Sequence, residues 1–597
     1  MGKTVGDHLC ERLQEWGVGT IYGYPGDGIN GIMGALGRHP GRPRFIQTRH
    51  EEMAAFMAGA HAKFTGEVGV CMATSGPGAI HLLNGLYDAK LDHQPVLAIV
   101  GQTYVRALGG AFQQEVKLLQ LFSDVASAFC EQVNSPAALR HCLDRALRIA
   151  IAERTVTCLI IPADVQEEDA VERPPHATHT VHSGVGFWPP VVVPGHRDLE
   201  RAAEILNAGQ KVAILVGQGA LGASAEVLEV ADKLGAGIAK ALLGKGVVAD
   251  DVPFCTGSIG LLGTRPSWEM MSGCDTLLMV GSSFPYSEFL PPEGQARGVQ
   301  IDIDPRMLSL RYPMEIALVG DSQRTLAELL PLLERKPDRT WQEQIEKSVA
   351  KWWRLMDDRA QPRLQNGRLR PQALFAELSR RVPGNAIITS DSGSAANWFA
   401  RHVRVRPGMT LSLSGNLATM VPGVPYAIAA KFAYPERLAV ATVGDGAMQM
   451  GGSAELLTAA EHYREWSDPR LIILVLNNQD LNQVTWEQRV LSGDPRFEAS
   501  QRLPEFDYAA YARQIGLGAM RVERPEEIAG AWQAALACDR PFLIDAVTDP
   551  EEPPLPPHIT FEQARKFMAS VGAAPRAGAP GAVNALREKV DEFVPGR

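Results

Sequence analysis

Two short segments in the last third of the chain contain residue types that bind metal ions and phosphates. Gly444-Asp445-Gly446 follows an apolar run at 438–443, and Asn477-Asn478 ends a second apolar run at 471–476. Glycines allow a backbone to approach a phosphate closely, and a helix that starts near Ala447 would present free N–H groups to it. Asp445 and Asn478 would supply the hard oxygen ligands that Mg²⁺ prefers. The segments therefore indicate a site where Mg²⁺ bridges the protein and a diphosphate; the alternative is an ordinary turn between a strand and a helix.

These segments need elements that bring them together, and the apolar runs supply such elements. Short runs without alternation predict strands buried on both faces of a parallel sheet, whose carboxyl ends open into a ligand crevice. Similar runs alternate with helical patterns along most of the chain, so the sequence predicts an α/β fold with doubly wound parallel sheets. The further runs are 68–73, 96–100, 158–161, 212–216, 276–280, 299–303, 387–390 and 542–547.

The composition is that of a soluble globular protein. The 597 residues are 45% hydrophobic and 21% charged, which predicts three or four domains. A net charge of −10 without a basic block argues against nucleic-acid binding. No apolar run reaches the roughly 18 residues of a membrane span. The eight cysteines are scattered without a CxxC pair, which predicts buried thiols in a reducing cytoplasm rather than disulfides or a zinc site.

Two further features are ambiguous by spacing alone. Glu51 and Glu52 begin an apolar helical pattern about 100° apart, so only one of them can point into a given pocket. Both could equally do no more than favour the positive end of the helix dipole. Gly217 and Gly219 lie between a strand-like run and a helical pattern, which suits a nucleotide, but a plain packing turn explains them as well.

Longer stretches resemble one enzyme family. They are RHEEMAAFMAGAHAKFTGEVGVCMATSGPGAIHLLNGLYDAKLDHQPVLAIVGQ, VGSSFPYSEF, QIDIDP, and the Gly-Asp-Gly and Asn-Asn pair with 30 residues between them. Together they resemble the thiamin diphosphate-dependent pyruvate oxidases and the related acetolactate synthases, over about residues 4 to 570. The closest likeness is to the FAD-containing, quinone-linked pyruvate oxidases.

The resemblance implies three doubly wound parallel-sheet domains and a tail. We expect a pyrimidine-binding domain at 1–185, a central FAD-type domain at 195–340, a diphosphate-binding domain at 365–550 and a C-terminal tail at 551–597. A Pro-, Gly- and His-rich segment at 172–195 and a charged segment at 336–370 are interpreted as linkers between the domains, the second with a short helix around Trp341–Trp353.

The same resemblance assigns residues to thiamin diphosphate and Mg²⁺. Glu51 is implied to be the activating carboxylate, because a carboxyl group in an apolar cleft has a raised pKa and can share a proton with the cofactor's aminopyrimidine. Glu52 remains an ordinary helix-start charge. Met420 is implied to wedge between the two cofactor rings, although a Met in such a position is often core filler. The implied cofactor contacts are Pro25, Gly26, Glu51, Ser75, Gly76, Ser392, Gly393, Met420, Gly444, Asp445, Gly446, Ala447 and Asn478, and the implied metal ligands are Asp445, Asn478 and, through its backbone carbonyl, Asp480.

Resemblance also points to FAD in the central domain. Gly281 to Phe284 would approach the isoalloxazine, Asp302 and Asp304 the adenosine end, and Asp321 a ribose or ribitol hydroxyl. The implied contacts are Gly217, Gly219, Ala220, Gly260, Gly281, Ser282, Ser283, Phe284, Asp302, Asp304 and Asp321.

Four further residues are candidates for the reaction itself. Gln114 and Glu487 match family positions, and His81 is either a packing residue or an active-site group. The chain has Asn482-Gln483 where pyruvate oxidases carry Gly-Phe near the substrate, so Gln483 leaves the 2-oxo acid and the electron acceptor open.

These assignments imply an enzyme that decarboxylates a short 2-oxo acid, most simply pyruvate, and passes electrons to FAD and then to a quinone or O₂. The alternatives are a non-oxidative carboligase or decarboxylase of acetolactate-synthase type, and a catalytically silent thiamin diphosphate binder. Glu51 and Asp445 would serve one cofactor from two chains, which predicts a homodimer or homotetramer with active sites at subunit interfaces. We expect a cytoplasmic protein. An amphipathic stripe of Val583, Leu586, Val590 and Phe593 in the tail favours subunit packing, with weak membrane-surface contact as the lesser option.

Overall fold

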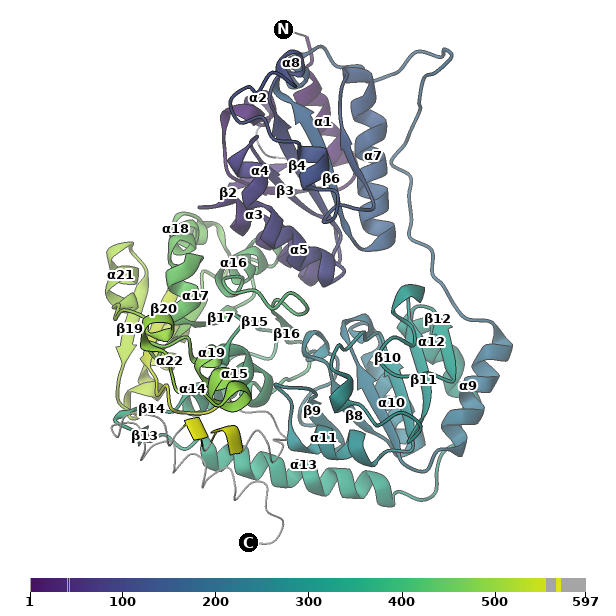
Figure 1. Cartoon of the computed structure of the whole chain (residues 1–597), viewed down its shortest axis with the longest axis vertical. Helices are drawn as coiled ribbons and strands as arrows, with labels where there is room; N and C mark the ends of the chain where they lie inside the picture. The colour runs from purple at the N-terminus through teal and green to yellow at the C-terminus, as the bar shows by residue number, and fades with distance from the viewer. Residues whose placement is uncertain (1, 40, 42, 555–564, 568, 571–597) are drawn as a thin grey trace.

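The computed structural model describes residues 2–39, 41, 43–554, 565–567, 569 and 570 (Figure 1). Three parallel six-stranded sheets, each covered by helices, follow one another along the chain. This confirms the predicted fold class. The apolar runs form the strands because both faces of each sheet are covered, which leaves their residues buried.

The N-terminal domain has the sheet order β2-β1-β3-β4-β6-β5. Its strands are β1 (Thr20–Gly23), β2 (Arg44–Gln47), β3 (Gly69–Ala73), β4 (Val96–Gln102), β5 (Cys130–Gln132) and β6 (Val156–Pro162). Its helices are α1 (Val5–Glu15), α2 (Asn30–Arg38), α3 (Glu51–Thr65), α4 (Pro77–His81), α5 (Leu83–Leu91), α6 (Leu118–Leu121), α7 (Pro136–Glu153) and α8 (Ala163–Glu167).

The middle domain has the order β12-β11-β10-β7-β8-β9. In chain order this is the 3-2-1-4-5-6 arrangement of dinucleotide-binding folds, read from β9 to β12. Its strands are β7 (Val212–Val216), β8 (Gly237–Lys240), β9 (Cys255–Ser258), β10 (Thr276–Val280), β11 (Arg297–Asp302) and β12 (Ile316–Val319). Its helices are α9 (His196–Ala208), α10 (Ser224–Leu234), α11 (Arg265–Gly273), α12 (Ser322–Leu329) and α13 (Thr340–Arg359).

The C-terminal domain has the order β16-β15-β17-β18-β20-β19. Its strands are β15 (Ile387–Ser390), β16 (Thr410–Ser412), β17 (Ala439–Gly444), β18 (Leu471–Asn477), β19 (Gly518–Val522) and β20 (Phe542–Val547), preceded by the hairpin of β13 (Leu364–Gln365) and β14 (Arg368–Leu369). Its helices are α14 (Pro371–Arg381), α15 (Ser394–His402), α16 (Gly423–Ala433), α17 (Asp445–Ala447), α18 (Ser453–His462), α19 (Asn482–Glu487), α20 (Glu498–Gln501), α21 (Tyr508–Gln514) and α22 (Glu527–Ala537).

The structure refines the sequence analysis at two places. The short helix expected around Trp341–Trp353 is present and longer: α13 has 20 residues and buries Ile345, Val349 and Trp352 along one face. Figure 1 shows this helix running beneath the middle and C-terminal domains. The helix expected to start near Ala447 begins at Asp445 and continues through a π-helical turn, Met448–Gly452, into α18. Segment 172–195 contains neither helix nor strand, as expected.

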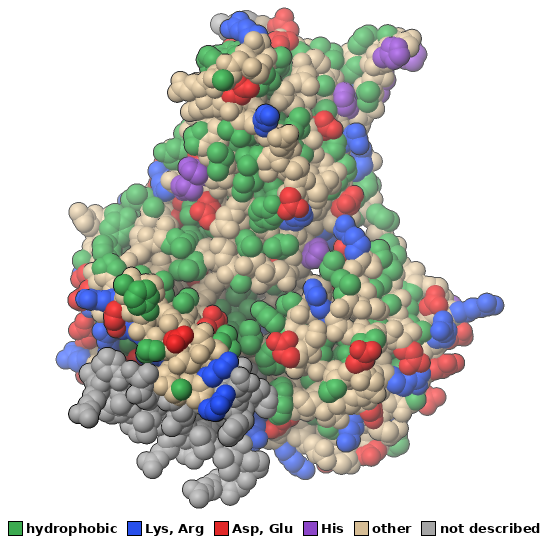
Figure 2. Space-filling view, in the orientation of Figure 1, with side chains coloured by type: hydrophobic (Ala, Val, Ile, Leu, Met, Phe, Trp, Pro, Cys, Tyr) green, Lys and Arg blue, Asp and Glu red, His purple; other side chains and the backbone are tan. Residues whose placement is uncertain are grey.

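The chain's surface and its cysteines match the expectations from composition. Side chains of both charge signs are interspersed on the face in Figure 2. All eight cysteines are free thiols, and Cys71 and Cys158 are buried. None of the helices in the described part of the chain combines the length and apolar character of a membrane crossing.

The N-terminal and C-terminal domains share one hydrophobic core, in which α3 packs on α16. Lys63 is buried at this junction, where its ammonium group donates to Asp92 (2.7 Å), to the Leu413 carbonyl (2.8 Å) and to the Tyr426 hydroxyl (2.7 Å). Asp92 also accepts from the backbone N–H of Gly415. One cation therefore ties the end of α3 to the segment that leads into the C-terminal site.

We expect Lys63→Met to destabilise the protein by about 3–5 kcal/mol, because it leaves the carboxylate of Asp92 buried without its cation. Urea and thermal unfolding measure the loss. Lys90→Met is the control: Lys90 pairs with the exposed Asp124, and such a pair contributes about 0–1 kcal/mol. Similar losses for the two variants would contradict the assignment.

Candidate functional site

Each sheet reverses its strand order beside its first strand, and several residues predicted to bind cofactors lie at that point. This reversal falls between β1 and β3, between β7 and β10, and between β15 and β17. The N-terminal and C-terminal sheets reverse again at the far edge, between β4 and β6 and between β18 and β20. Ligands of open α/β sheets bind in the crevice at the carboxyl ends of the two strands that flank such a point. Gly26 and Ser75, Gly217 and Gly281, and Asp391 and Asp445 each follow one such pair of strands.

Asp445 follows β17 and is 2% exposed. Its carboxylate accepts backbone N–H groups from Gly446 (3.0 Å) and Gln479 (2.6 Å), and burial raises its pKa to about 7. Asn478, on the neighbouring strand end, accepts the N–H of Asp480 through its side-chain oxygen at 2.9 Å. Main-chain bonds therefore hold the side chains of Asp445 and Asn478 at adjacent strand ends.

These residues fit a divalent cation. Within the described part of the chain Asp445 has no cationic partner, and a buried carboxylate of this kind needs one to remain ionised. Asp480 differs, because its carboxylate lies 2.9 Å from the guanidinium of Arg496. The backbone carbonyl of Asp480, rather than its side chain, could therefore join Asp445 and Asn478 in holding Mg²⁺.

Asp391, at the end of β15, is a residue that the sequence analysis missed. Its buried carboxylate accepts backbone N–H groups from Ser392 (2.9 Å), Val421 (2.9 Å) and Gly423 (3.2 Å), and burial raises its pKa to about 7. Val421 has φ of +90°, which is rare for a β-branched residue. Asp391 thus holds strained backbone on the C-terminal side of Met420. Its position after an apolar run was a signal that could have identified it.

The loop that Asp391 holds places Met420 against the turn at residues 444–447. The Met420 side chain lies 3.2 Å from where a Cβ on Gly446 would stand, so a larger residue at 446 would collide with it. Ser392 donates to the Thr419 carbonyl at 2.7 Å and fixes the other side of the loop. Gly393, next to it, has φ of +82°. The predicted residues Ser392, Gly393, Met420 and Gly446 are therefore brought together, with Gly444 and Ala447 in the same turn.

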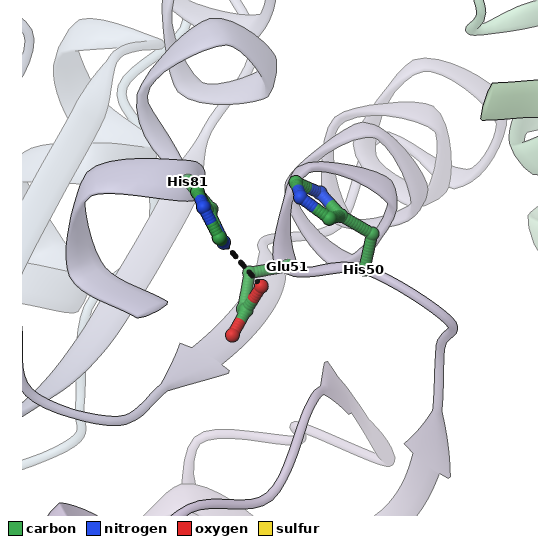
Figure 3. Close-up of side chains that lie close together, drawn as sticks. All are labelled: His50, Glu51 and His81. Carbon is green, nitrogen blue, oxygen red and sulfur yellow. Dashed lines mark hydrogen bonds and ion pairs between the residues drawn. The ribbon is translucent and has the colours of Figure 1, made fainter. Parts of the chain in front are cut away.

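In the N-terminal domain, Glu51 begins α3 and is 8% exposed. Figure 3 shows its carboxylate directed at the His81 ring, with an Oε2 to Nδ1 distance of 2.9 Å. The His50 ring stacks on His81 with centroids 4.4 Å apart. The ligand atoms of these three residues all lie within 4.8 Å of one another. The open question about His81 is thus answered in part: it contacts Glu51 rather than filling core space.

Glu52 does more than begin the helix. Its carboxylate accepts from Asn84 at 2.5 Å, and Asn84 also donates to Thr419 of the C-terminal domain at 3.0 Å. Glu51 contacts His81, whereas Glu52 contacts Asn84. This geometry is consistent with the expectation that only one of the two glutamates faces a given pocket.

The glycine turns around Glu51 form a close-packed cradle. A Cβ on Gly78 would lie 3.1 Å from Glu51, and one on Gly26 would lie 2.5 Å from Thr74. Ser75 donates to Gln114 at 3.0 Å, and Gln114, with φ of +61°, packs against Gly76. Pro25 is exposed beside this turn. The structure therefore gathers the predicted residues of this domain.

In the middle domain the glycines follow β7 and β10 and touch through their backbones. A Cβ on Gly217 would lie 2.2 Å from the Gly281 carbonyl, and one on Gly219 would lie 2.8 Å from the Gly281 Cα. Close packing of the two turns thus explains these glycines without a ligand. Ala220 and Ser282 are buried in the same turns and Ser283 is half-buried; Gly260 (φ +97°) packs on the ring of Phe284.

The three aspartates of the middle domain differ in what they already bind. Asp304 pairs with Arg306 at 2.9 Å, and Asp321 caps α12 by accepting the Arg324 N–H at 2.9 Å. Asp302, at the end of β11, is 8% exposed, accepts a backbone N–H, and has its pKa raised by burial. Of the three, Asp302 is therefore the carboxylate that, among the described residues, neither forms an ion pair nor caps a helix.

Glu51 and Asp445 lie in different domains, which Asn84 joins through its hydrogen bond to Thr419. In the described residues no hydrogen bond or ion pair links Glu51 or His81 to Asp445, Asn478 or Asp480. Large apolar side chains are exposed beside both halves: Ile80 and Phe112 in the N-terminal domain, and Met450, Val484 and Phe497 in the C-terminal domain.

The fold and the site define a protein of three α/β domains, with buried carboxylates in its first and third domains. Family models agree: the N-terminal TPP binding domain of thiamine pyrophosphate enzymes matches residues 3–121, their central domain 199–329 and their C-terminal TPP binding domain 391–546. The chain belongs to the thiamine pyrophosphate enzyme family.

Three relatives cover nearly the whole chain. It is 38% identical to the thiamine pyrophosphate-containing protein YdaP of Bacillus subtilis, over 95% of both chains. It is 30% identical to a pyruvate oxidase of Lactiplantibacillus plantarum, over 95% of this chain and 92% of the relative. It is also 31% identical to the acetolactate synthase isozyme 2 large subunit of Escherichia coli, over 92% of this chain and 97% of the relative.

We expect Asp445→Asn to weaken Mg²⁺-dependent thiamin diphosphate binding about tenfold or more, because it removes the charge that would balance the cation. Calorimetric titration at several Mg²⁺ concentrations measures this. Asp468→Asn, near the opposite end of β18, should bind as wild type does. Unchanged affinity in Asp445→Asn would exclude Asp445 as a metal ligand.

A second prediction concerns Glu455 on α18, which accepts the Arg49 N–H at 3.1 Å and thereby positions the start of α3. Burial raises its pKa from 4.5 to about 7. The unfolded chain releases this proton near pH 4.5 but the folded chain only near pH 7, so the group lowers stability as pH rises between these values. Glu455→Gln should therefore lose less stability than wild type between pH 5 and pH 8, by up to about 3 kcal/mol. Urea unfolding at both pH values tests this, and equal losses would contradict it.

Proposed function

We propose that this protein decarboxylates a short 2-oxo acid such as pyruvate, with thiamin diphosphate and Mg²⁺, and passes two electrons to FAD and then to a quinone or O₂. The observation that carries the proposal is the buried Glu51 in contact with the exposed His81 in one domain, combined with the buried Asp445 and Asn478 in another. Thiamin diphosphate has an aminopyrimidine at one end and a diphosphate at the other. Glu51 would serve the aminopyrimidine, and Asp445 and Asn478 would hold the diphosphate through Mg²⁺. When bound, this cofactor supplies a nucleophilic carbon and an electron sink.

The chain's own residues have distinct parts in this proposal. Glu51 would hold and move a proton at a ring nitrogen of the aminopyrimidine. His81 would orient the Glu51 carboxyl through their 2.9 Å contact. Met420, held by its strained loop, would set the angle between the two cofactor rings, which is catalysis by positioning.

We propose that two chains build each site, as a homodimer or homotetramer. The exposed apolar side chains beside Glu51 and beside Asp445 support this. The described Phe567 stacks on Trp486 of α19, with ring centroids 5.6 Å apart, so the start of the tail packs near the site. The predicted amphipathic stripe at Val583, Leu586, Val590 and Phe593 lies outside the described residues.

FAD in the middle domain is supported by the dinucleotide-type strand order and by Asp302. A non-oxidative carboligase is the second candidate function. Gln483 favours it, because the resembling oxidases carry an aromatic residue at that position, and the 31% identity to an acetolactate synthase subunit also favours it.

Anaerobic mixing with a panel of 2-oxo acids tests these proposals when flavin absorbance and released CO₂ are recorded together. An oxidase bleaches its flavin while it releases CO₂. A carboligase releases CO₂ and forms a coupled product with the flavin unchanged. If the protein released CO₂ from none of these acids, the proposed function would be overturned.

We expect Glu51→Gln to lower CO₂ release about 100-fold or more, because a neutral amide cannot exchange the proton. Glu52→Gln is the matched control and should retain most of the activity. Equal effects of the two substitutions would remove Glu51 from its proposed part.

A further inference from the structure

Three side chains beside the metal-binding turn form a hydrogen-bonded chain. Asn397 on α15 donates through Nδ2 to Oε1 of Gln483 at 2.9 Å. Gln483 on α19 in turn donates through Nε2 to Oε1 of Glu487 at 2.9 Å. The sequence analysis had singled out Gln483 and Glu487, but it gave no role to Asn397.

Asn397 fixes which way the Gln483 amide faces. Asn397 is 0% exposed. Its Nδ2 also lies 3.5 Å from the carbonyl oxygen of Gly393, which can only accept. The amino group of Asn397 therefore faces Gly393 and Gln483. The Oε1 of Gln483 is then occupied, and its Nε2 faces Glu487. One N–H of Gln483 and one oxygen of Glu487 are left without a partner among the described residues.

This pair lies beside the turn that the proposed function assigns to the cofactor's diphosphate. The Gln483 Cβ is 4.0 Å from where a Cβ on Gly393 would stand, next to the turn predicted to contact the diphosphate. Gln483 also follows the Asp480 carbonyl by only three residues. Gln483 is half-buried and Glu487 is exposed in the single chain, so a ligand can reach both.

We propose that Gln483 and Glu487 bind a hydroxyl group, and that the preferred substrates are short 2-oxo acids with a hydroxyl on the carbon next to the keto group. A hydroxyl accepts one hydrogen bond and donates another, and the pair offers one N–H donor and one carboxylate acceptor. A methyl group at that position would leave both partners desolvated and unpaired. A second carboxylate on the substrate would be repelled by Glu487.

The inference rests on the proposed function, and the test separates the two. 3-Hydroxypyruvate and 2-oxobutanoate differ by a hydroxyl in place of a methyl group of similar size, so they form a matched pair. Initial rates of CO₂ release give kcat/KM for each. We expect wild type to favour 3-hydroxypyruvate by about tenfold or more, as sites built to bind a hydroxyl reject analogues without it.

Substitutions then identify the residues responsible. Gln483→Met keeps the side-chain length but removes the amide, and it should bring the ratio of the two kcat/KM values close to one. Asn397→Leu should lower the same ratio, because Gln483 would lose its fixed orientation; a purely structural role would lower both rates equally and leave the ratio unchanged. Gln323→Met, which removes a similar amide–carboxylate contact with Glu226 in the middle domain, should keep the wild-type ratio.

The outcomes are distinct. Release of CO₂ from neither acid, nor from pyruvate, would overturn the proposed function and this inference with it. Turnover of 2-oxobutanoate as fast as that of 3-hydroxypyruvate would leave the proposed function intact and overturn the inference alone. A wild-type ratio in Gln483→Met would do the same.

Discussion

Two carboxylates buried at neighbouring strand ends set the main constraint on this protein. Asp391 and Asp445 follow β15 and β17, and each accepts only backbone N–H groups in the described residues. Burial raises the pKa of both to about 7, so each depends on main-chain donors or a cation to carry charge. Asp391 uses its oxygens to hold strained backbone at Val421, whereas the Asp445 carboxylate could bind a metal ion. The geometry of the C-terminal site follows from that division.

Strand order places the candidate residues of the three domains at the carboxyl ends of their sheets. Each order reverses beside the first strand of its sheet, where the loops diverge and leave room for a ligand. The N-terminal and C-terminal sheets have equivalent orders, but Glu51 follows the edge strand β2, whereas Asp445 follows β17, the counterpart of β3. The middle sheet has the dinucleotide-type order.

Unusual backbone is found around the candidate site. Four of the ten non-glycine residues with positive φ in the described part of the chain lie near it: Gln114, Ala418, Val421 and Gln479. Such backbone persists only where surrounding contacts impose it, as the Asp391 carboxylate does at Val421. The amide chain from Asn397 to Gln483 lies beside the same turns and puts hydrogen-bonding groups where the resembling oxidases carry an aromatic residue.

The sequence by itself determined the fold class, the strands and the segments that carry chemistry. Strands buried on both faces read as short apolar runs, and the residues that follow them in the chain are those that line the crevice. Only the tertiary structure decided that His81 contacts Glu51, that Asp391 holds the Met420 loop and that Asn397 orients Gln483. These contacts join residues 30, 30 and 86 positions apart. Periodicity and local motifs report on neighbours within a few residues, whereas contacts at such separations depend on how whole sheets and helices pack.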